Sequence, residues 1–359
     1  MMKILIINPL GIGDVIFSTP IIEILHKHFP GSYIGYICNR RASDLLETDP
    51  RINKIFIYEK DDYRQAWHES KVSAVKKIFF FLKLVKSEKF NMSIDLSLTY
   101  QYSMCMKFIG IKKRIGLNYR NRGKFLTDKV DIEGFEDKHV IEYYLDLLRP
   151  LGIDVSQYKI TPKVYLPKTE QEIVKSLLNE SDIGNNDILV GIIPGCGASW
   201  GLDAKYRRWL PENFAKVADD LVEKNKAKII LFGDKKDIEV CAAVRSLMKH
   251  KSIMACGKTA IKEFLSLTNK CKVIVTNDGG PLHIAVGLGV STVSIFGPVD
   301  ENVYGPYPKS EKHTVVSKND VKCRPCYKKF KYDRCENRIC LDSITVDEVY
   351  AAAEKALKR

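Results

Sequence analysis

Residues 277–307 have the sequence NDGGPLHIAVGLGVSTVSIFGPVDENVYGPY, and this stretch decides which fold the chain is expected to adopt. It follows a short apolar run at residues 273–275 that is typical of a buried strand. Two glycines then form a tight turn, Pro281 suits a first helical position, and small and apolar residues continue at helical spacing to residue 288. A second apolar strand follows at residues 292–296. The order strand, glycine turn, short helix, strand predicts a parallel α/β sheet.

The turn at the start of this stretch has the features of an anion-binding site. Gly279 and Gly280 let the backbone approach a ligand closely, and the N–H groups of the helix start present partial positive charge. Any tight strand-to-helix turn can use glycine, so the two glycines alone leave a purely structural role open. Asp278 and His283 add polar side chains, and we therefore interpret the turn as a candidate phosphate site.

These residues also carry a family resemblance. The motif D-G-G-P-x-H-I-A, followed by F-G-P-x-D, resembles the donor-binding segment of glycosyltransferase family 9, the heptosyltransferase family of lipopolysaccharide synthesis. Members of that family usually have D-S/T-G-x-x-H at this place, and here Gly279 replaces the hydroxyl residue. The resemblance implies that Asp278, Gly279, Gly280 and His283 bind a nucleotide-sugar donor.

The composition describes a globular chain with an anionic partner. A length of 359 residues predicts about two domains, and the net charge of +13 favours nucleic acid, phosphate-bearing lipid or an acidic sugar as partner. The apolar run at residues 78–82 is far shorter than the roughly 20 residues that a membrane helix needs. The N-terminus has no small-residue cleavage site and is expected to form the first strand, so we expect a cytoplasmic protein.

A second turn with a candidate catalytic residue follows the first predicted strand, at residues 3–8. Gly11, Gly13 and Asp14 precede a predicted helix at residues 15–28, but the G-x-G-x-x-G of dinucleotide-binding folds is incomplete. An Asp at a helix start is commonly a cap, although open α/β sheets bind ligands at this end of their strands. The pattern G-x-G-D-x-x-x-x-T-P resembles the N-terminal motif of the same family. That resemblance makes Asp14 the catalytic base and places Gly13 on the acceptor side.

Basic residues of the first half suggest an acidic acceptor and a membrane surface. Arg40, Arg120 and Arg122 could line an acceptor site, although a merely soluble surface would use the same residues. Residues 71–90 predict a helix with a wide apolar face and six lysines, which resembles a membrane-surface helix. An ordinary helix that faces the core and carries a solvated basic side is the alternative.

The second half repeats the pattern of strands that end in small-residue turns. Prolines at residues 161–167 indicate a linker. A strand at residues 188–193 then leads into Gly195 and Gly197, followed by a segment that resembles the family's P-G-x…K-R-W-P. Aligned on the tryptophan, Arg207 takes the place of the lysine that contacts the donor pyrophosphate, and Lys205 is a possible substitute. Arginine suits this role because its planar fork binds phosphate oxygens in pairs.

The next turn, after a strand at residues 228–232, is where the family often has an acid for the nucleoside ribose. We assign this role to Asp237, with Asp234 as the alternative. Both residues could instead be turn formers. The turns after residues 193, 232 and 275 would all lie at the same edge of one parallel sheet.

Four of the ten cysteines form a cluster near the C-terminus, in a stretch that we call the cysteine segment (residues 323–340). Four thiolates that include a C-x-x-C pair fit a tetrahedral site for structural zinc or iron, and free thiols or a disulfide are the alternatives. Similar clusters occur in parts of the family, including iron-containing heptosyltransferases that modify autotransporter proteins. The candidate ligands are Cys323, Cys326, Cys335 and Cys340.

The resemblance covers nearly the whole chain and implies the GT-B architecture, an α/β fold of two facing Rossmann-like domains with parallel sheets. Residues 1–165 would form the acceptor domain, together with a C-terminal helix at residues 343–359 that crosses back onto it. Residues 166–342 would form the donor domain and contain the cysteine segment.

The implied function is inverting transfer of heptose from ADP-heptose to a hydroxyl of the lipopolysaccharide core, without a catalytic metal or other cofactor. It would take place in the cytoplasm or on the cytoplasmic face of the inner membrane. A protein acceptor of the autotransporter type is an alternative. A nucleic-acid-binding protein would also explain the charge and the cysteines, and it is retained as an alternative. A nucleotide-dependent oxidoreductase would explain the sheets but lacks the glycine fingerprint.

Overall fold

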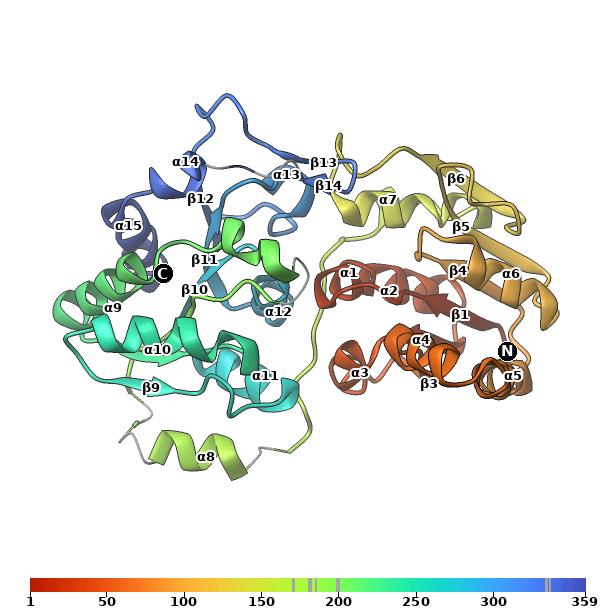
Figure 1. Cartoon of the computed structure of the whole chain (residues 1–359), viewed down its shortest axis with the longest axis horizontal. Helices are drawn as coiled ribbons and strands as arrows, with labels where there is room; N and C mark the ends of the chain where they lie inside the picture. Colours follow the sequence, from red (N-terminus) through yellow and green to blue (C-terminus); the bar gives the residue numbers. More distant parts are fainter. Residues whose placement is uncertain (170–171, 180–182, 185, 198–200, 333–334, 336) are drawn as a thin grey trace. The chain divides into compact units, whose positions relative to one another are not determined.

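The computed structural model describes residues 1–359 except 170–171, 180–182, 185, 198–200, 333–334 and 336 (Figure 1). The chain forms two compact units, Met1–Ile160 and Thr161–Arg359. Their boundary lies at the start of the proline-containing stretch that the sequence analysis interpreted as a linker. Each unit contains one six-stranded parallel sheet with helices, which confirms the predicted α/β fold class.

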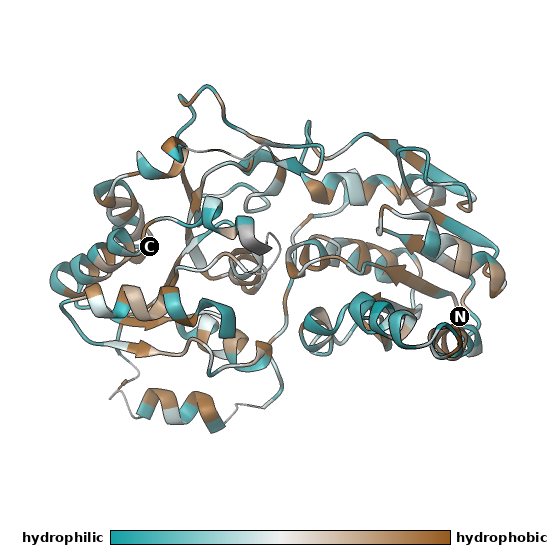
Figure 2. Cartoon of the chain, in the orientation of Figure 1, coloured by the Kyte–Doolittle hydropathy of each residue, from teal (hydrophilic) through white to brown (hydrophobic). Residues whose placement is uncertain are grey.

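The sheet of the first unit has the strand order β3-β2-β1-β4-β5-β6. Its strands are β1 (Lys3–Ile7), β2 (Tyr33–Cys38), β3 (Lys54–Ile57), β4 (Met92–Asp95), β5 (Lys113–Tyr119) and β6 (Asp128–Ile132). Its α-helices are α1 (Ile12–Phe17), α2 (Thr19–His28), α3 (Arg40–Leu46), α4 (Lys60–Glu69), α5 (Lys71–Ser87), α6 (Tyr100–Phe108) and α7 (Val140–Asp146). The central strands are hydrophobic along most of their length, as expected for strands covered on both faces (Figure 2).

The helix predicted at residues 15–28 is two helices in the structure, α1 and α2, which meet at Ser18. Pro20 has no N–H group to continue the hydrogen-bond ladder of α1. The hydroxyl of Thr19 donates instead to the main-chain oxygen of Ile16, at 2.8 Å. The break therefore follows from the T-P pair of the N-terminal motif, and it leaves α1 as a short separate helix that carries Asp14.

The sheet of the second unit has the order β12-β11-β10-β7-β8-β9. Read from β9 to β12, this order repeats that of the first sheet from β3 to β6. Its strands are β7 (Leu189–Ile193), β8 (Lys228–Leu231), β9 (Ser252–Met254), β10 (Val273–Asn277), β11 (Ser291–Phe296) and β12 (His313–Ser317), and a small hairpin is formed by β13 (Tyr327–Lys328) and β14 (Lys331–Tyr332). Its α-helices are α8 (Glu172–Asn179), α9 (Pro211–Asn225), α10 (Ile238–Leu247), α11 (Ile261–Lys270), α12 (Gly280–Leu288), α13 (Glu301–Tyr304), α14 (Ile339–Asp342) and α15 (Val346–Leu357).

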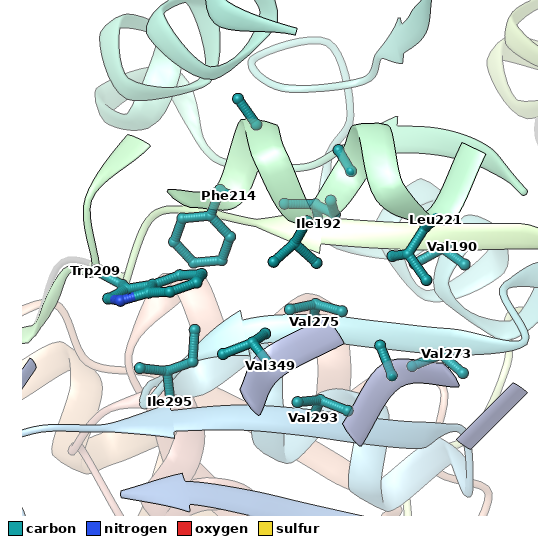
Figure 3. Packing of buried hydrophobic residues seen from close by; sticks show 14 of the residues in the cluster. Val190, Ile192, Trp209, Phe214, Leu221, Val273, Val275, Val293, Ile295 and Val349 are labelled. Atoms are coloured by element: carbon teal, nitrogen blue, oxygen red, sulfur yellow. The ribbon is translucent and has the colours of Figure 1, made fainter. Parts of the chain in front are cut away.

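The core of the second unit joins α9, the central strands and α15. Figure 3 shows Trp209 and Phe214 at one end of this layer and Val349 among the valines of the strands. The indole N–H of Trp209 donates to the main-chain oxygen of Ile344, at 3.1 Å, which ties the start of α9 to the C-terminal segment.

The C-terminal helix packs within the second unit, which corrects the expectation that it would cross back onto the first. Its buried residues Val349, Ala353 and Ala356 lie at helical spacing and contact the core beside α9 and β11. The apolar stripe of α15 is therefore covered by the second unit.

Candidate functional site

Three turns of the second unit meet at the side chain of Asn277, the last residue of β10. The amide nitrogen of Asn277 donates to the main-chain oxygens of Pro194 and Gly195, at 2.8 and 3.2 Å. Its amide oxygen accepts the main-chain N–H of Trp209, at 3.0 Å. The side chain is fully buried, so it is a fixed connection between the turns after β7 and β10 and the segment before α9. Asn277 has no role predicted from the sequence, although a primary amide at the end of a buried strand demands several partners.

Asp278 and Arg207 form a buried ion pair in the same region. A guanidinium nitrogen of Arg207 lies 2.5 Å from the carboxylate of Asp278 and 3.0 Å from its main-chain oxygen. Burial raises the pKa of Asp278, and the charge of Arg207 acts in the opposite direction. The pair joins the segment before Trp209 to the turn after β10, so the two predicted donor residues are brought together by the fold.

The glycine turn after β10 is shaped by a close main-chain contact. A Cβ atom added at Gly279 would lie 2.5 Å from the main-chain oxygen of Cys196, far inside normal contact distance. This contact explains why glycine replaces the hydroxyl residue that the family usually has. Gly280 begins α12, with Pro281 in its first turn and the buried His283 in the second. Binding of an anion at this helix start stays a prediction.

The turn after β8 holds Asp237 in a structural arrangement. One carboxylate oxygen accepts from Arg208 at 2.8 Å, and the other accepts the main-chain N–H of Asp234 at 3.3 Å. Asp237 is buried, and a Cβ atom at Gly195 would lie 2.4 Å from its carboxyl group. Asp234 is exposed and accepts the main-chain N–H of Lys236 at 2.7 Å. Asp234, the alternative candidate for the ribose-binding role, is therefore more accessible than Asp237.

Lys205 is an exposed cation of the segment before α9. It lies in a 3-10 helix, η3 (Gly201–Arg207), and its ammonium group is 5.1 Å from the centre of the Tyr206 ring. Arg207, by contrast, is buried against Asp278. Gly197 has a φ of 74°, in the left-handed region that favours glycine.

In the first unit, Asp14 lies at the carboxyl edge of the sheet, in the first turn of α1 after β1. The phenol of Tyr144 from α7 donates to its carboxylate, at 3.4 Å. Burial raises the pKa of Asp14 to about 6, against hydrogen bonds from Gly11 and Tyr144 that lower it. A carboxylate with this pKa is a better proton acceptor than an exposed one. Sequence reasoning missed Tyr144, which lies 130 residues away in the chain.

The predicted acceptor residues follow strands at the same edge of the first sheet. Arg40 begins α3 after β2 and pairs with Asp62 at 3.1 Å. Arg120 and Arg122 follow β5, and their guanidinium groups lie 5.0 and 5.5 Å from the centre of the Tyr119 ring. In the sheet, β1 has β2 on one side and β4 followed by β5 on the other. The exposed Arg40 therefore follows a strand on one side of the Asp14 turn, and the exposed Arg120 and Arg122 follow a strand on the other.

A second carboxyl group with a raised pKa lies at this edge. Asp95 is the last residue of β4, paired with Ile7 of β1, and burial raises its pKa to about 6. One carboxylate oxygen accepts the main-chain N–H of Ser97 at 2.9 Å, and the other is buried without a hydrogen-bond partner among the described residues. A lone Asp at a strand end gave no sequence signal that distinguishes it from a turn former.

The four cysteines of the cysteine segment lie near one another. The pKa of the Cys326 thiol is raised to about 11, mainly by burial and in addition by Cys323, Cys340 and Cys335. The Cys326 thiol lies 3.0 Å from the main-chain oxygen of Cys323, and that of Cys335 lies 2.9 Å from the main-chain oxygen of Asn337. Within the described residues, no group of three or more His, Cys, Asp or Glu side chains is arranged to hold a metal ion. The metal site at these four cysteines therefore stays a prediction.

Comparisons with known proteins place these features in a family. The family model described as glycosyltransferase family 9 (heptosyltransferase) matches residues 78–335, more than half of the chain. Lipopolysaccharide heptosyltransferase 3 of Escherichia coli is 22% identical in an alignment 355 residues long that covers 96% of each protein. No helix in the described ranges combines the length and hydrophobicity required to span a bilayer.

Solved structures agree with the fold. A glycosyltransferase family 9 protein of Veillonella parvula superposes with a TM-score of 0.82 at 23% identity, covering 99% of this chain and 97% of its own. The ADP-heptose lipopolysaccharide heptosyltransferase II of E. coli superposes with a TM-score of 0.77 at 20% identity, covering 99% of both chains. The expected GT-B fold is thereby confirmed, and the chain belongs to glycosyltransferase family 9, the heptosyltransferase family.

Proposed function

We propose that the protein transfers heptose from ADP-heptose to a hydroxyl group of the lipopolysaccharide core, with inversion at the anomeric carbon and with Asp14 as general base. The single observation that carries the proposal is the half-buried Asp14 carboxylate, whose pKa is raised to about 6, at the carboxyl edge of the first sheet. The named relatives support the substrate class, because they are lipopolysaccharide heptosyltransferases.

In this mechanism the acceptor hydroxyl gives its proton to Asp14 while its oxygen forms a bond to the anomeric carbon. The bond between that carbon and the phosphate oxygen breaks, and ADP leaves with the electron pair. The departing diphosphate needs positive charge around it. Lys205 and the N–H groups at the start of α12 supply this charge, so the proposal requires no catalytic metal.

On the donor side, the geometry suggests a revised division of roles. Arg207 holds Asp278 in place and Lys205 is the direct phosphate ligand, because Arg207 is buried in an ion pair and Lys205 is exposed. Asp234 takes the ribose-binding role in preference to Asp237, whose two carboxylate oxygens are both engaged within the protein. Gly195, Gly197, Gly279 and Gly280 allow the donor to approach the backbone.

On the acceptor side, the anionic core sugar lies against the exposed Arg40, Arg120 and Arg122, with Gly13 beside the reacting hydroxyl. Guanidinium groups bind phosphates and carboxylates through paired hydrogen bonds. The acceptor is lipid-linked, so the enzyme also works at a membrane surface.

Helix α5 is the membrane-contacting element in this proposal. It buries only Ala74, Phe81 and Val85, and it exposes Phe79 and Phe80 by 70% and 63%. Exposed lysines accompany them at positions 71, 76, 77, 83 and 86. An apolar helix face with adjacent lysines fits an anionic lipid surface. The test is co-sedimentation with vesicles that contain phosphatidylglycerol: binding should weaken in the Phe79→Ser, Phe80→Ser variant, and equal binding would contradict this assignment.

A structural zinc or iron ion at Cys323, Cys326, Cys335 and Cys340 stays a prediction. What supports it is the donor set of four neighbouring thiols and the C-x-x-C pair. Elemental analysis of protein purified without added metal tests it, and less than about 0.2 equivalents per chain would contradict it.

The enzymatic proposal is tested by mass spectrometry of products from ADP-heptose with a heptose-deficient lipopolysaccharide core or with an autotransporter protein. Modification of the core sugar alone supports the proposal. Modification of the protein alone would show that the acceptor is a protein and not the core sugar. A thermal-shift panel separates the other classes: ADP should stabilise the protein, and NAD or an oligonucleotide should not.

A further inference from the structure

The cysteine segment contacts two main-chain loops of the second unit that lie near the predicted donor site. Arg324 lies between Cys323 and Cys326, and Arg338 lies between Cys335 and Cys340. Each arginine points into a different loop of the second unit. We propose that Arg324 and Arg338 are positioning residues through which the cysteine segment fixes the shape of the donor site. This inference rests on the proposed function, because it takes the second unit as the nucleotide-sugar unit.

Arg324 holds the loop after β11, which contains the F-G-P-x-D motif. It donates to the main-chain oxygen of Gly297 at 2.6 Å and to that of Val299 at 3.1 Å. It also forms an ion pair with Glu301 at the start of α13, and both side chains are buried or nearly so. The main-chain N–H of Cys326 adds a hydrogen bond to the oxygen of Pro298, at 2.9 Å. The loop is thus attached to the cysteine segment at three successive carbonyl groups.

Arg338 holds the loop that precedes α9 and carries the basic residues. It donates to the main-chain oxygen of Lys205 at 3.1 Å and to that of Arg208 at 2.8 Å, and it pairs with Asp342 at 3.0 Å. The Tyr332 ring of the same segment lies 5.5 Å from the Tyr206 ring. The contacted residues flank Arg207, so they determine where that arginine meets Asp278.

These contacts form one continuous path to the glycine turn. Arg338 holds residues 205–208 through hydrogen bonds to their main chain. Arg207 of this loop donates a hydrogen bond to Asp278, which immediately precedes Gly279. From the other side, the positive charge of Arg324 also reaches Asp278 and favours its ionised form. A main-chain carbonyl oxygen only accepts hydrogen bonds, so the two guanidinium groups and the Cys326 N–H supply the donors that hold these loops. The arginines therefore act on donor binding through loop geometry and do not touch the reacting atoms.

The experiment compares full-length Arg338→Ala and Arg338→Lys with Lys331→Ala, an exposed lysine of the same segment. Calorimetry with ADP, and KM and kcat with ADP-heptose, are measured for each. We expect Arg338→Ala to raise the Kd for ADP and the KM for donor at least about fivefold, the loss of about one net hydrogen bond. Its kcat at saturating donor should fall less than about twofold, since donor binding alone is affected. Arg338→Lys should be intermediate because an ammonium cannot serve both carbonyls equally well.

Unchanged ADP affinity in a folded Arg338→Ala protein would overturn the inference, as would an equal loss in Lys331→Ala. A fall in kcat with unchanged KM would also overturn it, because that result places Arg338 in the chemical step. If Arg338→Ala does not fold, Arg338→Lys and Arg324→Lys give the same comparison. Failure of the proposed function is seen separately, since the wild-type protein would then bind no ADP.

Discussion

Arg207 and Asp278, which are 71 positions apart in the sequence, form a buried ion pair at 2.5 Å. A residue that the family resemblance assigned to the donor pyrophosphate is therefore committed to a neighbouring carboxylate. A buried pair of this kind is costly to break, because removal of one partner leaves the other charge without compensation.

The first prediction distinguishes Arg207, as a cation that stabilises the fold, from Lys205, as a proposed phosphate ligand. Arg207→Ala should destabilise the second unit by about 3–5 kcal/mol and lower its melting temperature by roughly 10 °C. Lys205→Ala should leave the melting temperature within about 2 °C and weaken ADP binding, because the side chain is exposed. Calorimetric melting and ADP titration of both variants give the comparison. The reverse pattern would show that Arg207 is the phosphate ligand.

The second prediction concerns the base. Asp14→Asn should reduce kcat by at least about a hundredfold while ADP binding stays normal, since only the proton acceptor is lost. Asp154→Asn, which changes an exposed carboxylate of the same unit, is the matched control and should retain wild-type turnover. Single-turnover rates and ADP affinity are the readouts. Turnover near wild type in Asp14→Asn would rule out its role as base.

The third prediction is a pH profile. Asp14 must be ionised to accept a proton, and burial raises its pKa to about 6. The value of kcat/KM should therefore be constant above about pH 7 and fall about tenfold per pH unit well below 6. Tyr144→Phe removes the phenol that donates to Asp14, which favours the ionised form, so it should shift this limb to higher pH. If the acidic limb of the kcat/KM profile does not move in Tyr144→Phe, or moves to lower pH, the titration belongs to another group.

The fourth prediction tests the tight glycine turn. Gly279→Ser introduces the residue type that relatives usually have, yet its Cβ would lie 2.5 Å from the oxygen of Cys196. We expect a loss of stability of about 1–3 kcal/mol and weaker ADP binding, because the two turns must separate. Gly184→Ser, at an exposed position where a Cβ atom meets only the Asp187 carboxylate at 3.7 Å, is the control. Improved binding in Gly279→Ser would show that the turns are further apart than the structure has them.

The fifth prediction concerns Asp95. Its pKa is raised in the folded state to about 6 from an ordinary 3.8, so the folded protein holds this proton more tightly than the unfolded chain. The associated loss of stability begins as the pH rises above about 4 and is complete above about 6, with a total of roughly 3 kcal/mol. Asp95→Asn cannot ionise, so the stability of the variant relative to wild type should increase between about pH 4 and 7. Denaturant titrations at several pH values measure this difference, and a constant difference would contradict the assignment.

The strands and turns of this chain could be predicted from the sequence because its parallel strands are continuous apolar runs that end in Gly, Pro or Asp. The turn at Gly279 and the candidate base Asp14 could be located for this reason. The partners of those residues could not, because Tyr144 and Asn277 act through tertiary contacts that leave no local pattern. The burial of Arg207 and the exposure of Lys205 were also hidden, since both are cations at neighbouring positions in the sequence.

The C-terminal helix shows the same limit. Residues 345–358 clearly predict a helix, but an apolar stripe does not say which of two domains will cover it. In the structure, Thr345 caps α15 and the stripe faces α9. Likewise, the wide apolar face of residues 71–90 fitted both a core helix and a surface helix, and exposure of Phe79 and Phe80 favours the second.

Because α15 completes the core of the second unit, the two halves of the protein are each encoded by an uninterrupted stretch of gene. A cut in the linker near residue 160 should release a C-terminal fragment that folds on its own and retains nucleotide affinity. Such a fragment would be open to separate engineering, for instance by exchanging it between relatives to combine one donor preference with another acceptor.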